Sequence, residues 1–548
     1  MKIMAKRKSE LQEIDKVALS ELIQRVEHAI AHDLALSVED MKLLLSAIIT
    51  LCTLQEKIEQ DDVTLYKLRK LLGMVKQSES RRSELSSKKK SDANPHKLKN
   101  NNSTKKEPKK PLVVHHKMTA YHGGQVCPGC ERGKLYKYEP GKLLRITGHA
   151  PYEATQHITE QLRCNGCQHI YKACLPAEVL ADGEADQMYG YSARALMVMD
   201  KFYSGLPYYH QSNVSQLFGH AVSAATIFDQ CEHVANDVMP VYYEFQRLAA
   251  SAQQFLVDDT HNRILTQEPE LRDRRNGKGQ QLRTGIYSSG LIAQLDNGHE
   301  IVLFETSLGH AGEHLDSILK KRDPTLPPPR TMSDALSSNT PIVTPVIQSY
   351  CNAHCRRQFY DVAALYPDEV EWVLDTYSVI WQNESNIKEQ KLNAKQRLIY
   401  HQQHSLVVME SLKNWALKHQ QSVEFEAHST LGKAINYLLR HYDKLTLFCR
   451  EAGALIDNNR MEEKLKIVIR GRKTAHFYKT PVGAEIANVL ISLIATTDGA
   501  GVNLFDYLIA LQRNREAVKQ NPAAWLPWNY HEQVNKSNRE VVQITEAA

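Results

Sequence analysis

The chain has 548 residues, of which 42% are hydrophobic and 24% are charged, and its formal net charge is +5 at pH 7. A typical domain has about 100–150 residues, so we expect three or more folded units. Because no apolar run approaches the roughly 20 residues that cross a bilayer, and no apolar signal segment opens the chain, we expect a soluble cytoplasmic protein with no membrane partner.

Residues 1–80 carry the spacing of helices. Ser37-Val-Glu-Asp40 is typical of a helix start, and leucine and isoleucine then recur at three- to four-residue intervals up to Leu72. This pattern predicts a helical hairpin or a short coiled coil, which would serve either self-association or intramolecular packing.

Residues 81–117 are rich in lysine and arginine and poor in apolar residues. Such a stretch cannot bury enough surface to fold alone, so we expect a disordered basic linker. Two roles remain open, a solvated tether and contact with the DNA phosphate backbone.

Residues 118–180 contain two Cys-x-x-Cys pairs, Cys127 with Cys130 and Cys164 with Cys167. Each pair turns two thiolates to one side of a tight knuckle, and two knuckles supply the four soft ligands of tetrahedral Zn²⁺. The alternatives are two unrelated turns or two disulfides, but disulfide frameworks are typical of short secreted chains. We therefore predict a structural zinc ribbon, whose closed site leaves no position for a substrate.

Residues 185–252 have helical periodicity, interrupted at Gly219 and resumed after Ser223. A helix, a glycine that accepts the left-handed turn and a serine-capped second helix fit a helix-turn-helix that binds DNA. An ordinary helical hairpin has the same pattern.

The remainder predicts a multidomain α+β protein with a ribonuclease-H-like α/β core. Three strands are expected within residues 255–258, 284–293 and 301–304, followed by a helix at 312–321 and a short strand ending at Asp334. Residues 362–453 are helical and charged, and a new helix, capped by Asp457, should run through Glu462. The core is thus expected at residues 253–361 and 454–515, with a helical insertion at 362–453 and a tail at 516–548.

Three carboxylates fall where such a sheet could gather them. Asp258 stands at the tip of the first strand, Asp334 at the tip of the fourth, and Glu462 on the helix after the insertion. Phosphodiester cleavage and strand transfer use two divalent metal ions, and hard cations prefer carboxylates. Spacing alone does not prove convergence, because any long chain has acidic residues at strand ends.

Several blocks, in order, resemble the transposases of the insertion sequence 66 family over nearly the whole chain. They are Val257-Asp-Asp-Thr260, His310-Ala-Gly-Glu-His314, Met332-Ser-Asp-Ala-Leu336, Ala353-His-Cys-Arg-Arg-Gln-Phe359, Asp457-Asn-Asn459 with Glu462, Arg472-Lys473 with Phe477-Tyr478-Lys-Thr480, and Asn521-Pro-Ala-Ala-Trp-Leu-Pro-Trp-Asn-Tyr530.

The resemblance implies a DDE transposase, in which Asp258, Asp334 and Glu462 match the three acids that bind Mg²⁺ or Mn²⁺. Such an enzyme binds the terminal inverted repeats of its element, cleaves DNA there and transfers the freed strand to target DNA. The partners that the resemblance implies are double-stranded DNA, further copies of the chain and accessory proteins of the same element.

Two neighbouring acids compete with this assignment. Asp259 should point to the opposite face of the strand, because side chains alternate there, and it ranks second to Asp258. Glu463 is the rival of Glu462, since one helical step turns a side chain by roughly 100° and only one of the two can face the metals. The distance from Asp457-Asn-Asn459 favours Glu462.

Four cationic residues are expected to bind DNA: Arg356, Arg357, Arg472 and Lys473. For the first two the alternative is a structural salt bridge. Cys351, His354 and Cys355 could also be interpreted as a second metal cluster, but a third and fourth ligand are not evident.

Two departures from the family pattern keep other functions open. Glu463 stands where family members usually carry arginine, and Asp498-Gly-Ala-Gly501 replaces a Glu-Leu-Asn-Gly stretch. The alternative they favour is a catalytically decayed relative that only binds DNA. A stand-alone nuclease is a third possibility, supported by the shared acids alone.

Overall fold

The computed structural model describes residues 16–32, 34–44, 124–126, 128, 130, 132, 134–135, 150–163, 170–274, 279–422 and 426–536. The chain divides into two units, Met1–Lys97 and Leu98–Ala548, and each is described by itself.

The first unit contains helix α1 (Lys16–Ala31), and residues 38–44 are also helical. The Asp40 backbone N–H donates to Ser37 Oγ at 3.0 Å, as the sequence predicts for a helix start, and Arg25 of α1 pairs with Asp40 at 3.0 Å. These contacts join the two helical segments. The leucine-rich continuation and the basic linker expected at 81–117 lie outside the described residues.

The second unit begins with a small antiparallel pair, β1 (Gln161–Arg163) and β2 (Ile170–Lys172). Of the four cysteines expected to bind zinc, only Cys130 belongs to the described residues, where it is exposed. Cys127, Cys164 and Cys167 lie outside them. The zinc ribbon therefore stays a prediction.

A helical block follows, and its members are α4 (Ala177–Leu180), α5 (Tyr191–Val198), the π-helix η3 (Met199–Tyr203), α6 (Tyr208–Leu217) and α7 (Ala224–Ala250). Gly219 has a φ of +86°, and Ser223 Oγ accepts from the Thr226 N–H at 3.0 Å. The predicted turn and cap are thus present. However, α7 is 27 residues long and buries one face in the main core, so a role in DNA recognition stays a prediction.

A five-stranded mixed sheet in the order β7-β6-β3-β8-β9 forms the centre of this unit. Its strands are β3 (Gln254–Asn262), β6 (Ile286–Gln294), β7 (Glu300–Ser307), β8 (Arg330–Ser333) and β9 (Ile347–Tyr350). Strand β6 is antiparallel to both β3 and β7, whereas β3, β8 and β9 run parallel. A separate hairpin, β4 (Glu270–Asp273) with β5 (Gln280–Arg283), interrupts the path from β3 to β6.

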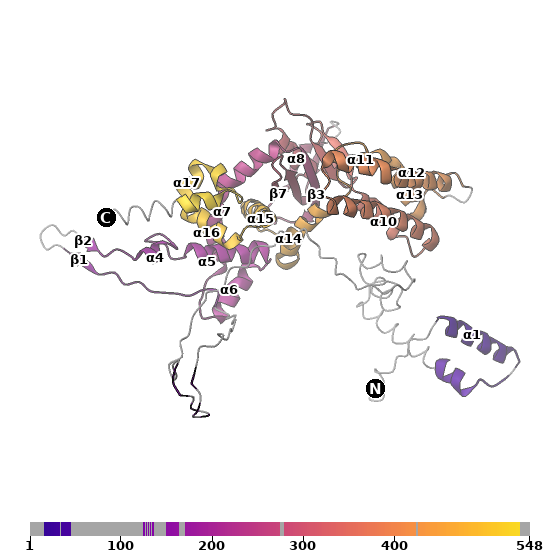
Figure 1. Cartoon of the computed structure of the whole chain (residues 1–548), viewed down its shortest axis with the longest axis horizontal. Helices are drawn as coiled ribbons and strands as arrows, with labels where there is room; N and C mark the ends of the chain where they lie inside the picture. The colour runs from indigo at the N-terminus through magenta and orange to yellow at the C-terminus, as the bar shows by residue number, and fades with distance from the viewer. Residues whose placement is uncertain are drawn as a thin grey trace. The chain divides into compact units, whose positions relative to one another are not determined.

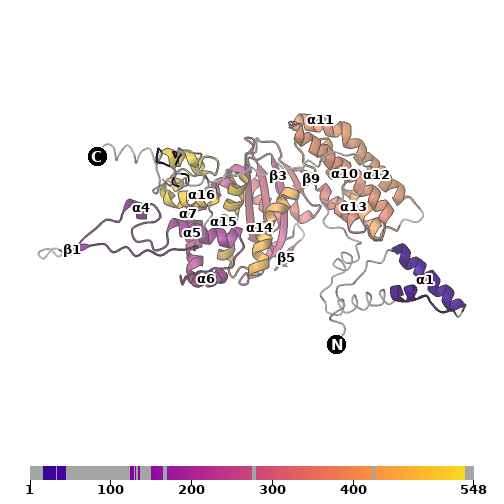
Figure 2. The same cartoon turned by 60° about the horizontal axis from the view of Figure 1, so that its bottom comes forward.

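Helices cover this sheet (Figures 1 and 2). Both α8 (Ala311–Leu319) and α14 (Asn459–Ala475) pack on β3 and β6, and α15 (Pro481–Gly499) lies along β7. The C-terminal elements α16 (Leu504–Arg513), α17 (Arg515–Gln520) and η6 (Pro522–Trp525) pack with α5 and α7.

Polar side chains of α15 bind the outer backbone groups of β7. The N–H groups of Val302, Phe304 and Thr306 donate to Thr496 Oγ1, Ser492 Oγ and Asn488 Oδ1 at 2.9–3.0 Å. The match is periodic, because a strand turns every second N–H outward and a helix presents every fourth residue on one face. These bonds satisfy donors that the neighbouring strand β6 cannot reach.

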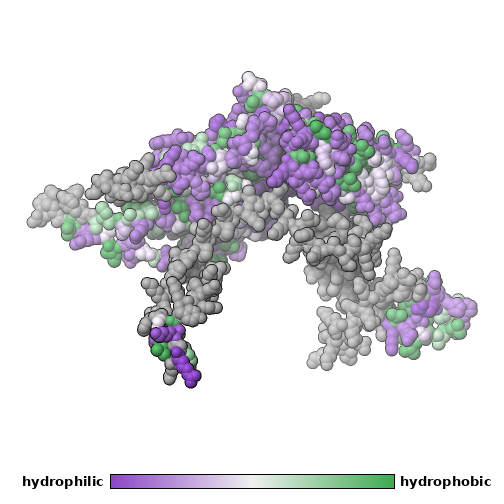
Figure 3. All heavy atoms as spheres, in the orientation of Figure 1, coloured by the Kyte–Doolittle hydropathy of each residue, from purple (hydrophilic) through white to green (hydrophobic). Residues whose placement is uncertain are grey.

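The buried side chains form two main cores. The sheet core joins α5, α7, the sheet, α8, α14, α15 and α16. The insertion core lies within residues 350–456, among the end of β9 and the helices α9 (Asn352–Tyr360), α10 (Pro367–Glu389), α11 (Ala394–His404), α12 (Leu406–Gln420) and α13 (Thr430–Leu445) with the turn η5 (Leu447–Cys449). On the face in Figure 3 most side chains over these helices are hydrophilic, as on an ordinary solvated surface.

The mixture of helices with a mixed sheet agrees with the expected α and β content. All three predicted long strands are present: β3 and β7 extend beyond their predicted ends, and β6 begins two residues later than predicted, while β4, β5 and β9 were not predicted. The predicted cap at Asp457 is wrong, because Asn458 is the N-cap of α14. Among the described residues, no helix combines the length and the apolar character that crossing a membrane requires.

Candidate active site

Two of the predicted acids lie side by side because of strand register. Parallel pairing joins Leu256 of β3 to Met332 of β8, and continuing it by two residues sets Asp258 beside Asp334. Neighbouring strands are about 4.8 Å apart, and residues in register point to the same face of a sheet. The two carboxylates therefore share one face at the carboxyl ends of parallel strands.

The third acid reaches this place because α14 lies close against β3. Gly290 of β6 stands opposite Asp258, and a Cβ atom there would collide with Met461 of α14. The fully buried Asn458 fixes the start of the helix, since its side-chain amide donates to the Val257 carbonyl at 3.0 Å. Glu462, one turn into α14, is thereby brought toward Asp258.

The pKa of Asp258 reflects the nearness of the other acids. Burial, followed by the nearby carboxylate of Asp334 and then by Asp259 and Glu462, raises the pKa of Asp258 to about 8, against the opposing effect of the Asp259 N–H. Several anions in a partly buried place repel one another, and a divalent cation relieves that repulsion. The donor set therefore fits a hard divalent metal ion.

The neighbouring acids differ in exposure and contacts. Glu463 is exposed, whereas Glu462 is half-buried and acts on Asp258. Asp259 accepts a 2.8 Å contact from His310 Nδ1 at the start of α8, as expected for a side chain on the other face of β3. The choice of Asp258 and Glu462 as metal ligands stays a prediction, with Asp259 in contact with His310 and Glu463 exposed.

Asp334 is held by its own loop. Its carboxylate accepts from the side-chain amide of Asn339 at 2.7 Å and from the Leu336 N–H at 3.2 Å. These bonds orient the carboxylate directly after β8. They leave its other oxygen available for a metal ion.

Helix α8 packs against the loop that follows Asp334. Gly312 has no room for a side chain, because a Cβ atom would stand 2.5 Å from the Thr340 carbonyl oxygen. One turn later, the buried carboxylate of Asp316 accepts from the backbone N–H groups of Ile342, Val343 and Thr344 at 2.9–3.2 Å. The same short helix thus fixes both Asp259, through His310, and the segment that follows Asp334.

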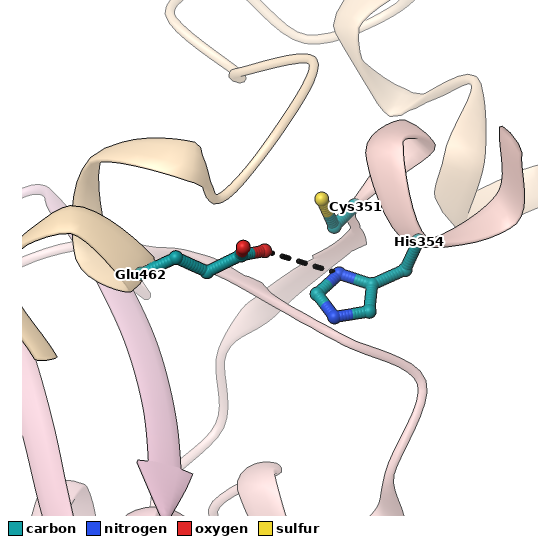
Figure 4. A group of neighbouring side chains, drawn as sticks. All are labelled: Cys351, His354 and Glu462. Carbon is teal, nitrogen blue, oxygen red and sulfur yellow. Dashed lines mark ion pairs between the residues drawn. The ribbon is translucent and has the colours of Figure 1, made fainter. Parts of the chain in front are cut away.

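A second group of side chains adjoins the acids. Cys351, His354 and Glu462 offer ligand atoms that all lie within 4.8 Å of one another (Figure 4). Cys355, which sequence proximity had joined to Cys351 and His354, is instead buried in the insertion core beside Tyr377. Glu462 takes its place in the group.

The four cations expected to bind DNA lie in different settings. Arg357 and Lys473 are exposed, and the Arg356 guanidinium lies 6.0 Å from the centre of the Tyr360 ring. Arg472 donates to Thr260 Oγ1 at 3.0 Å and to the His261 carbonyl, so it holds α14 to the end of β3.

Several supporting residues escaped the sequence analysis. Asn339 and Trp381 carry no local signal, and Asn458 was noted only as part of the Asp457-Asn-Asn459 block. The indole N–H of Trp381, on α10 of the insertion, donates to Asp457 Oδ2 at 3.0 Å. Such long-range contacts could have been found only by knowing the fold.

Comparison with known proteins identifies related chains. Residues 186–486 match the model of the Transposase IS66 family. Two curated proteins of Sinorhizobium fredii, both described as uncharacterized, are similar: y4hP, 23% identical over 390 residues, and y4jD, 25% identical over 391 residues. The matches cover 68% of this chain, and 66% and 72% of the two relatives.

Proposed function

The chain belongs to the IS66 family of transposases, and we propose that it cleaves DNA at the ends of an insertion sequence and transfers the freed strands to target DNA. The proposed active site is the acid cluster of Asp258, Asp334 and Glu462. DNA, further copies of the chain and accessory proteins of the element are its proposed partners.

The observation that carries the proposal is the convergence of the three acids. Asp258 and Asp334 stand 76 residues apart in sequence, and Glu462 follows Asp334 by another 128. All three nevertheless lie near the carboxyl ends of β3 and β8. Sheet order lends support. Three antiparallel strands followed by two that run parallel to the first are what we expect of a ribonuclease-H-like core.

Bound Mg²⁺ or Mn²⁺ would supply activation of the attacking oxygen and stabilisation of the leaving oxygen. The chain's own part is to hold three carboxylates in a fixed arrangement. Asn339 orients Asp334, and Gly290 and Asn458 allow α14 to set Glu462 beside β3.

The departures from the family pattern do not weaken the cluster. Glu463 is exposed and turned away from it, and Asp498 lies 3.4 Å from Lys464 in an ion pair that ties α15 to α14. A catalytically decayed DNA-binding protein therefore gains no support from either position.

The test uses a duplex that carries an element end, identified from DNA flanking the gene, with the full-length protein and Mg²⁺. Asp258→Asn, Asp334→Asn and Glu462→Gln should each reduce cleavage at least about 1,000-fold, a barrier increase of about 4 kcal/mol. Mobility-shift assays should show nearly unchanged DNA binding, because docking does not need the metals.

Glu463→Gln is the matched control, since it removes a neighbouring carboxylate that faces solvent. It should cleave DNA at a rate within about 3-fold of the unaltered protein, as expected for a surface change. Full cleavage by Asp334→Asn, or equal losses for Glu463→Gln and Glu462→Gln, would rule out this assignment.

A further inference from the structure

We propose that Cys351, His354 and Glu462 form a second metal site, selective for a zinc-like transition-metal ion, which shares Glu462 with the acid cluster. Ligand atoms of the three side chains lie within 4.8 Å of one another. In Figure 4 the Glu462 carboxylate points toward the imidazole, and the thiol lies beside both.

The local fold prepares the sulfur atom for a metal. Strand β9 ends at Tyr350, Cys351 is the N-cap of α9, and His354 follows one turn into that helix. Cys351 Sγ accepts the Asn458 backbone N–H at 3.2 Å, and so also faces the start of α14. Burial raises the pKa of the Cys351 thiol to about 12, against the lowering effect of the neighbouring backbone N–H groups, so the thiol would give up its proton only as a metal binds.

The imidazole has an unused nitrogen at the same place. His354 Nδ1 is buried and has no hydrogen-bond partner in the described part of the chain. Its distance to Glu462 Oε1 is 3.6 Å, too long for a hydrogen bond but suited to two ligands of one ion. Zinc–nitrogen and zinc–oxygen bonds of about 2.0–2.2 Å would bridge such a gap.

Ligand chemistry separates this site from the acid cluster. Thiolate and imidazole select zinc-like ions, whereas carboxylates alone suit Mg²⁺ and Mn²⁺. Three protein ligands leave a fourth position open, unlike a closed structural site. The proposed soft site is therefore distinct from the zinc ribbon expected at Cys127, Cys130, Cys164 and Cys167.

Sharing Glu462 has a regulatory consequence, which rests on the proposed function. An ion held by Cys351 and His354 draws the Glu462 carboxylate away from Asp258 and Asp334. Zn²⁺ should then inhibit Mg²⁺-dependent cleavage by competing for a shared ligand rather than by displacing DNA.

Cobalt titration of the full-length protein tests the site directly, without DNA. With the four cysteines of the predicted zinc ribbon first saturated by one equivalent of Zn²⁺, and with Mg²⁺ in excess, added Co²⁺ should develop a thiolate-to-cobalt charge-transfer band. Cys351→Ser and His354→Gln should each weaken the binding of this ion at least about 100-fold, since loss of a mere outer-shell partner already costs 10–100-fold. Serine is a good N-cap, so Cys351→Ser should keep α9 folded.

Matched controls use a distant cysteine and a neighbouring carboxylate. Cys174→Ser, at an exposed thiol, and Glu463→Gln should leave the cobalt spectrum unchanged, whereas Glu462→Gln should weaken binding. Spectra and metal content of Cys351→Ser and His354→Gln identical to those of the unaltered protein would overturn the proposal. Because no DNA is present, a failure to cleave DNA would count against the proposed function alone.

Discussion

The sheet core and the insertion core satisfy their buried polar groups in different ways. In the sheet core, Asn488, Ser492 and Thr496 bind β7, and these side chains do not titrate. In the insertion core, a chain of hydrogen bonds runs from Ser405 through His401 to Glu384, whose carboxylate also pairs with Arg397 at 3.0 Å.

The two cores therefore contribute to the proposed active site in different ways. The sheet core positions the acids by strand register and close packing, and its contacts between α15 and β7 do not depend on pH. The insertion core contributes charged or titratable groups and touches the site at its border, through His354 and through Trp381. Activity should therefore depend on the geometry of the first core and be modulated by the state of the second.

The largest effect on the sheet core is expected from Asp316→Asn. Asparagine offers one acceptor oxygen where the buried carboxylate receives three backbone N–H groups, so the loop loses part of its attachment to α8. We expect a loss of about 3 kcal/mol, seen by calorimetry as a lower Tm. Asp323→Asn, at an exposed aspartate after α8, should leave the Tm nearly unchanged. Equal losses would show that the carboxylate does not hold the loop.

Gly290→Ala should come next. The added methyl group meets Met461 and the Phe304 ring, so α14 must move from β3 and carry Glu462 with it. Overpacking of this kind costs about 1–3 kcal/mol, and cleavage should fall together with stability. Gly471→Ala, on the same helix with open space around it, should instead be neutral or stabilising by about 0.5–1 kcal/mol. A stable, fully active Gly290→Ala protein would contradict the close-packing argument.

Acid should weaken the insertion core through His401. Burial lowers the pKa of His401, although its hydrogen bond to Glu384 acts in the opposite sense. The unfolded chain then binds a proton near the ordinary histidine pKa of about 6.5 while the folded chain does not, so unfolding becomes easier as the pH falls below that value.

Glu384 extends the same trend to lower pH. Burial would raise its pKa, but the hydrogen bond from His401 and the charges of Arg397 and Lys388 together hold the pKa below its ordinary value. This stabilisation is present above about pH 4.3 and is lost as the pH falls through the folded-state pKa.

Thermal melts between pH 7.5 and 5 check the prediction. His401→Gln should reduce the pH dependence of the Tm at which the insertion core unfolds. His314, whose pKa is lowered by burial in the sheet core, provides the comparison. If His314→Gln removes the pH dependence and His401→Gln does not, the acid-sensitive region is the sheet core.

The smallest effect is expected from Trp381→Phe. This change removes the indole N–H that binds Asp457 but keeps an aromatic ring in α10. The loss of one hydrogen bond to a partly exposed carboxylate should cost about 1 kcal/mol and lower cleavage by less than about 10-fold. Trp372→Phe, at a ring that stacks on Trp415 at 5.5 Å, serves as the control and should leave cleavage unchanged.

Sequence reasoning located β3, β6, β7 and β8, the first three from their apolar runs. Asp258 follows such a run, whereas Asp334 follows the mainly polar Arg330-Thr-Met-Ser333 and, like Glu462, was supported by residue blocks in family order. Strand β9 was missed since Ile-Gln-Ser-Tyr has only four residues and little apolar character. The prediction of Asp457 as the N-cap was wrong because the side-chain amide of Asn458 binds the Val257 carbonyl, 201 residues earlier in the chain.

Contacts between segments distant in sequence could not be predicted. Proximity along the chain grouped Cys355 with Cys351 and His354, whereas helical geometry turns Cys355 into the insertion core and leaves Glu462 as the third member. The role of Gly290 likewise depends on how near α14 comes to the sheet, which no pattern of spacing encodes.

The cover that α15 provides over β7 limits how copies of this protein can assemble. An uncovered outer strand is a template on which another chain adds its own strand. Here the outward N–H groups of Val302, Phe304 and Thr306 are already bound, so growth of the sheet across β7 would first require α15 to be peeled away. The multimers proposed to form on DNA would have to use other surfaces, and a partially unfolded chain that has lost α15 would expose this edge to aggregation.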